Sequence, residues 1–213
     1  MDKKLLMACM AIAVFAASLV PAVSASPVAT DPVGTSLAVG SSITGLTSGN
    51  ATFTSSVNFI CSDAHFTGTL TANTGTQIKG ELVQGATIFT GTADKEDCTS
   101  SLGSIGVTVN TKLCFETVKG TDNLIITGCT QEMTFSLNVT GATTCKYKGN
   151  VTTGATFKTN ADATINIVNG QKGTASEPKP IPLEEGGFLC SSTYTLDMHF
   201  NLTTTDGSTI LVS

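Results

Sequence analysis

The chain has 213 residues, a formal net charge of −5 and a pI near 4.9. Hydrophobic residues make up 40% of it and charged residues 13%, which excludes intrinsic disorder because disordered chains combine low hydrophobicity with high net charge. All eleven Lys and Arg residues are lysines. No guanidinium is therefore present to read guanine or to clamp phosphate, and we expect no nucleic-acid partner.

Residues 1–25 have the organisation of a secretory signal peptide. Lys3 and Lys4 form a short basic start, an apolar run covers residues 5–20, and the small residues Val23 and Ala25 suit a signal-peptidase site. A membrane-spanning helix would need about 20 apolar residues, more than this run provides. We predict cleavage after Ala25, a secreted, extracellular or cell-envelope location, and no membrane attachment after cleavage.

Two stretches of the remaining chain look irregular. Residues 26–34, with the sequence SPVATDPVG, are predicted to form a flexible N-terminal tail behind the cleavage site. Residues 175–187 are rich in Pro and Gly and are predicted to form a long exposed loop. Residues 35–213 are predicted to form a single domain.

Threonine alternates with apolar residues along this domain, which indicates half-buried β-strands because threonine is β-branched and fits a pleated surface. The expected strands cover residues 66–70, 77–83, 86–91, 105–109, 111–118, 123–127, 133–139, 146–152, 163–168, 194–202 and 208–212. One face of the 194–202 strand carries only apolar side chains: Tyr194, Leu196, Met198, Phe200 and Leu202. Short strands separated by turn residues predict an all-β fold, an antiparallel sandwich or barrel.

Six cysteines follow the predicted signal peptide: Cys61, Cys98, Cys114, Cys129, Cys145 and Cys190. An even number in an exported chain predicts three disulfides. Zinc ligation is a poor explanation, because zinc sites use close pairs such as C-x-x-C and no such pair is present. Six cysteines allow 15 pairings, which the sequence leaves open, and we favour pairing of nearest neighbours along the chain.

The pattern Asp-x-His-Phe occurs twice and contains both histidines of the chain. Asp63 precedes His65, and Asp197 precedes His199. Positions i and i+2 of a strand point to the same side, so each Asp should lie beside its His on a polar face. We favour two solvated pairs. The alternative is a metal-binding protein or metal-dependent hydrolase in which all four residues converge on one cation.

Nothing else in the sequence indicates catalysis. The chain has no Gly-x-Ser-x-Gly nucleophile elbow, and disulfide formation would remove the thiolates of all six cysteines. We therefore predict no enzyme, no catalytic residue and no cofactor.

The C-terminal third carries a resemblance to known proteins. The stretch CKYKGNVT over residues 145–152, LCSS over 189–192, the 196–202 strand and the closing GSTILVS over 207–213 resemble a loose group of exported, threonine-rich proteins common among actinobacteria. The resemblance implies a bacterial, exported β-fold with Cys145 bonded to Cys190. No activity accompanies the group.

Taken together, these features predict an exported, disulfide-stabilised β-scaffold with a non-catalytic binding or structural role, and the partner stays unknown. The metal-dependent alternative rests on Asp63, His65, Asp197 and His199. A third alternative is a small-molecule carrier with an apolar cavity inside a barrel.

Overall fold

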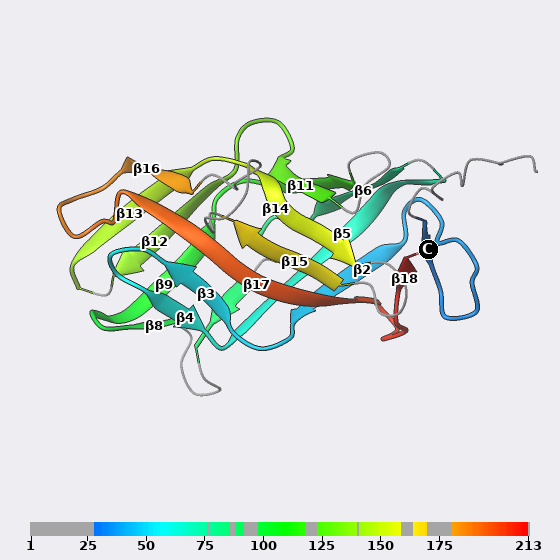
Figure 1. The fold of residues 1–213 in the computed structure, drawn as a ribbon, viewed down its shortest axis with the longest axis horizontal. Coiled ribbons are helices and arrows are strands. Elements are labelled where there is room, and N and C mark those ends of the chain that lie inside the picture. The colour runs from blue at the N-terminus through cyan, green and yellow to red at the C-terminus, as the bar shows by residue number, and fades with distance from the viewer. Residues whose placement is uncertain are drawn as a thin grey trace, which may run out of the picture.

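The computed structural model describes residues 28–75, 77–85, 88–91, 98–117, 123–139, 141–158, 164–169 and 180–212. Within these ranges the chain folds into strands that pair antiparallel, and it contains no helix, as the alternating pattern predicts (Figure 1). No apolar helix of membrane-spanning length occurs in this part of the chain. The predicted signal peptide, residues 1–25, lies outside the described residues.

Eight strands close into an antiparallel barrel, the second of the two architectures that the sequence allows. Their order around the barrel is β15-β14-β11-β10-β6-β5-β2-β17, and the pairing of β17 with β15 completes the circle. The strands are β2 (Ser42–Thr47), β5 (Asp63–Thr74), β6 (Gln77–Leu82), β10 (Leu113–Thr117), β11 (Asn123–Gly128), β14 (Val151–Lys158), β15 (Thr164–Asn169) and β17 (Thr193–Thr204). We call this set the first ring.

The pairings close a second ring of strands, which shares β17 with the first. From β17 it runs through β16, β13, β12, β9, β8, β4 and β3, and β3 pairs back onto β17. These strands are β3 (Ala51–Thr54), β4 (Phe59–Cys61), β8 (Cys98–Ser100), β9 (Gly103–Val109), β12 (Thr134–Val139), β13 (Thr143–Lys148) and β16 (Ile181–Glu185). Figure 1 shows β17 running along the molecule, with the second ring toward one end and the first toward the other.

The long strand β17 joins the two rings because each half of it has different neighbours. Its first residues pair with Ile181 and Pro182 of β16 and with residues 52–54 of β3. Its later residues pair with β15 and with residues 43–47 of β2. The predicted apolar face of this strand is confirmed, since every second residue from Tyr194 to Leu202 is buried. That face lines the interior of both rings.

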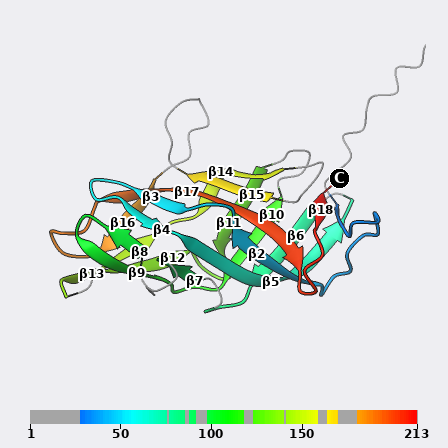
Figure 2. The same cartoon turned by 90° about the horizontal axis from the view of Figure 1, so that it is seen from below.

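Three short strands lie outside the two rings. β7 (Ile88–Thr90) pairs with the start of β5, and β1 (Ala29–Thr30) pairs with β18 (Leu211–Val212). Figure 2 shows β18 beside the C-terminus. The tail predicted over residues 26–34 needs correction for its described part, residues 28–34. Ala29 is 3% exposed, and the Asn73 side chain of β5 both accepts from its N–H and donates to its carbonyl, at 2.9 and 2.8 Å. One amide side chain thus fixes this segment to the barrel.

The loop predicted over residues 175–187 also needs correction, because residues 181–185 form β16. Ile181 is 1% exposed, and Leu183 packs against the core from the same side of the strand. The burial of Ile181 and Leu183 on one side of the strand stabilises it more than the missing backbone N–H of Pro182 destabilises it. Residues 175–179 lie outside the described residues.

The single strand predicted over residues 146–152 is two strands in the structure. β13 ends at Lys148 and β14 begins at Val151, with Gly149 and Asn150 between them. The Gly149 N–H donates to the carbonyl of Met133 at 3.0 Å, and the Asn150 side chain accepts from the Met133 N–H at 3.0 Å. These two hydrogen bonds stabilise the interruption between β13 and β14.

Three disulfides brace the rings, and the nearest-neighbour pairing is confirmed. Cys61–Cys98 joins β4 to β8, Cys114–Cys129 joins β10 to the end of β11, and Cys145–Cys190 joins β13 to the segment after β16. One bridge therefore lies in the first ring and two lie in the second. Each limits the unfolded chain by closing a loop, an effect of roughly 2–4 kcal/mol per bridge.

Candidate functional site

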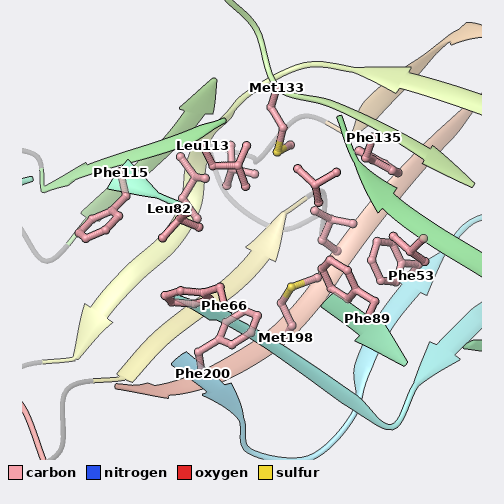
Figure 3. Close-up of a pocket in the computed structure, with 15 residues that line it drawn as sticks. Phe53, Phe66, Leu82, Phe89, Leu113, Phe115, Met133, Phe135, Met198 and Phe200 are labelled. Atoms are coloured by element: carbon pink, nitrogen blue, oxygen red, sulfur yellow. The ribbon is translucent and has the colours of Figure 1, made fainter. Parts of the chain in front are cut away.

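An apolar cavity lies inside the molecule, where the interiors of the two rings meet (Figure 3). Strands of both rings and the accessory strand β7 supply its wall. The residues that line it are Phe53, Phe66, Leu82, Phe89, Val107, Val109, Leu113, Phe115, Ile126, Met133, Phe135, Val151, Leu196, Met198 and Phe200. Every one of these side chains is apolar. The cavity has a volume of about 70 Å³.

Period-two alternation puts these side chains into the cavity wall. Leu196, Met198 and Phe200 are successive inward positions of β17, and Val107 and Val109 stand two apart on β9. Figure 3 shows the sulfur-bearing side chain of Met133 reaching toward the cavity from the side opposite Met198.

Two glycines make room for two aromatic side chains, Phe66 and Phe115, on the part of the cavity wall that the strands of the first ring supply. Gly45 of β2 pairs directly with Phe66 of β5, and Gly80 of β6 pairs directly with Phe115 of β10. A side chain on either glycine would overlap the opposite ring. Each phenyl group therefore packs over the backbone of a glycine. It covers a position where the glycine has no side chain of its own to bury.

The chemistry of the cavity is that of a dry, non-polar site. A polar or charged group placed there would lose its hydration and find no hydrogen-bonding side chain in the wall. Enclosed apolar cavities of larger volume bind apolar guests: an engineered cavity of roughly 150 Å³ holds benzene or xenon. The cavity here has about half that volume.

An aromatic cluster fills the second ring beyond the cavity. Phe135 stacks on Tyr147 with ring centroids 5.1 Å apart, and Tyr147 meets Tyr194 edge to face at 5.1 Å. The Tyr147 hydroxyl donates to the Ser191 carbonyl at 2.8 Å, so its polar end is satisfied in a fully buried place. Burial, with a smaller contribution from Tyr194, raises the pKa of Tyr147, and burial likewise raises the pKa of Tyr194.

The two Asp-x-His pairs form as predicted, each on the outer surface of its strand. His65 Nδ1 lies 3.5 Å from Asp63 Oδ2, and His199 Nε2 lies 3.4 Å from Asp197 Oδ1. All four side chains are between 37% and 49% exposed. Pairs this exposed gain little net energy from their attraction.

The structure does not bring the two pairs together. β2 lies between β5, which carries Asp63 and His65, and β17, which carries Asp197 and His199. No three of the four ligating groups come within 4.8 Å of one another. Among the described residues Glu81, Cys114 and Cys129 do meet that distance, but the two sulfurs are bonded to each other and offer no thiolate. The convergence that a shared cation requires is absent from these four residues.

The sequence pattern identifies the apolar faces but not the cavity between them. The alternation along residues 194–202 shows that Met198 and Phe200 point inward, whereas nothing local shows that Phe53 and Leu113 face them across the interior. No protein-family model, no curated protein and no solved structure matches this chain.

Proposed function

We propose that this protein is exported and acts outside the cytosol as a disulfide-braced β-scaffold with a binding or structural role rather than a catalytic one. The carrying observation is that all six cysteines beyond residue 25 are paired in three disulfides, spread over both rings. Such bridges persist in oxidising compartments and are rare in the cytosol. The signal-peptide pattern of residues 1–25 supports the same proposal.

Expression of the full chain in a bacterial secretion host tests the proposal. We expect released protein that begins at Ser26 and whose intact mass is lower than that of the reduced chain by two hydrogens for each of three disulfides. The variant Ala25→Arg places a large charge at the cleavage position and is the matched control, which should keep its leader. Free thiols in the released protein, or retention of the natural chain in the cytosol, would contradict the proposal.

The apolar cavity favours a second candidate function, the carriage of a small apolar molecule. The apolar side chains that line this cavity leave a space of about 70 Å³ between them. A barrel braced by disulfides can hold such a space open, because collapse of the wall would require the closed ladder of strands to deform.

A further inference from the structure

The cavity wall is thinner at one place than elsewhere. Twelve of the fifteen lining residues are buried, and the remaining three are only partly buried. These three are Phe89 of β7 and Val107 and Val109 of β9. The partial exposure of the wall is thus confined to the place where β7 and β9 meet, which we call the β7–β9 seam.

No ladder pair of the described residues joins the two strands of this seam. β7 and β9 lie side by side, but in the described part of the chain their ladder bonds all go to other strands. β7 pairs with β5, and β9 pairs along residues 105–109 with β12 on one edge. On its other edge β9 pairs with β8 only over residues 103–105, so the rest of that edge borders β7 without a registered pair. Opening the seam breaks no ladder pair that the described ranges contain and therefore costs less than separating two paired strands.

We propose that the cavity is a binding site for a small, uncharged, apolar molecule, which enters through the β7–β9 seam. This inference rests on the carrier function proposed above. The wall offers only hydrocarbon, aromatic and thioether surfaces, so it selects against charge and against hydrogen-bonding groups. The volume of about 70 Å³ limits an unadapted guest to a very small hydrocarbon or a gas atom.

The two methionines extend the range of guests. Met133 and Met198 are unbranched and have several rotatable bonds, so they can move aside for a ring the size of benzene more easily than branched side chains can. They are also the only methionines of the chain beyond residue 25, since the other three are Met1, Met7 and Met10. Every methionine methyl group of the chain beyond residue 25 therefore belongs to a residue of the cavity wall.

The test uses the mature protein labelled with ¹³C in its methionine methyl groups. Its two methyl signals are followed by NMR during titration with xenon, with benzene, and with benzoate, which adds a negative charge to the same ring. We expect both signals to shift saturably with xenon and benzene and to stay in place with benzoate. Methyl signals that do not shift with xenon and benzene, or that shift as much with benzoate, would overturn the site.

Position 109 and its neighbour provide a matched pair of variants. Val109→Phe fills the cavity, whereas Thr108→Phe places the same ring on the exposed side of β9. We expect Val109→Phe to weaken benzene binding at least about tenfold, a loss of some 1.4 kcal/mol, and Thr108→Phe to bind as the natural chain does. Equal binding by the two variants would overturn the location of the site.

The route into the cavity has its own control. Phe89→Ala and Leu113→Ala both enlarge the cavity, but only Phe89 stands at the seam, so only Phe89→Ala should speed the association of benzene, as measured from methyl line shapes. Equal association rates would overturn the route while the site stands. Failure of all binding would overturn the site and the carrier function together. The scaffold function is judged separately, from cleavage and disulfide mass.

Discussion

The contact between Gly80 and Phe115 allows a sharp test of how tightly the first ring is packed. Gly80 does not adopt a positive φ, so an alanine there meets no backbone strain. Its added Cβ would overlap the Cε1 and Cζ atoms of the Phe115 ring and lie 2.9 Å from the carbonyl oxygen of Thr69. Ordinary Cβ contacts are 3.4–4 Å, so either the phenyl group of Phe115 or the backbone of β6 has to shift.

The expected cost follows from two opposing effects. Overpacking of a well-filled interior costs about 1–3 kcal/mol. Replacing glycine by alanine also removes conformational freedom from the unfolded chain, which stabilises by about 0.4–1 kcal/mol. The Phe115 ring lines the cavity and can move partly into it, which favours the lower half of the range. The net of the two effects is a loss of up to about 1.6 kcal/mol in the free energy of unfolding of Gly80→Ala, which for a chain of this size lowers Tm by up to roughly 6 °C.

Calorimetry of the natural protein and four variants, namely Gly80→Ala, Gly75→Ala, Phe115→Leu and the double variant Gly80→Ala with Phe115→Leu, measures this effect. Gly75→Ala is the control, since a Cβ at Gly75 meets no atom within 4 Å and its φ is not positive, and it should leave Tm unchanged or raise it slightly. In the double variant Gly80→Ala with Phe115→Leu the ring is gone. Relative to the single variant Phe115→Leu, the alanine should then cost less than it does in the natural background. A Gly80→Ala protein as stable as Gly75→Ala would refute the close packing of Phe115 on Gly80.

Three further predictions concern the tyrosines and the disulfides. Tyr147→Phe removes the donor of the 2.8 Å bond to the Ser191 carbonyl and should lower the free energy of unfolding by about 1–2 kcal/mol, read from urea denaturation with unchanged far-UV circular dichroism. Because burial raises the pKa of Tyr147 and Tyr194, their contribution to stability is fully present below pH 10 and is lost as the pH rises toward the folded-state pKa values. Tyrosinate absorbance, which comes from these two residues alone, should therefore appear together with unfolding, and a titration near pH 10 in intact protein would contradict this. Replacing Cys145 and Cys190 by alanine opens a 45-residue loop, and replacing Cys114 and Cys129 opens a 15-residue loop, so chain entropy predicts losses of about 4 and 3 kcal/mol. The reverse order in chemical denaturation would show that strain or packing outweighs loop length.

Local sequence patterns predicted well where a strand has one wet and one buried face. β17 and β12 alternate strictly, and their inward residues are buried as expected. The pairing of the six cysteines followed their order along the chain, although Cys61–Cys98 and Cys145–Cys190 each join segments that have other strands between them in the sequence. Prediction was poorer for short strands such as β3 and β4, whose few residues carry too little period to be recognised. It failed at β16, where proline and glycine hid the alternation of Ile181 and Leu183.

The candidate site, too, could be predicted from the sequence only in part. That Asp63 lies beside His65, and Asp197 beside His199, follows from the two-residue period of a strand. Whether the two pairs meet depends on which strand lies between β5 and β17, and that strand is β2. The cavity depends on the same kind of information, because its wall is assembled from strands far apart in the chain.

By itself the sequence determined that the chain is built of strands, which face of the longer alternating strands is apolar and which cysteines are available for cross-linking. All three follow from the geometry and chemistry of short stretches of chain. Only the tertiary structure decided that β17 serves two rings, that Phe66 and Phe115 lie over glycines, and that a space stays unfilled between the rings. Backbone hydrogen bonds are the same for every strand and do not select partners, so the partners are selected by how distant side chains fill the shared interior.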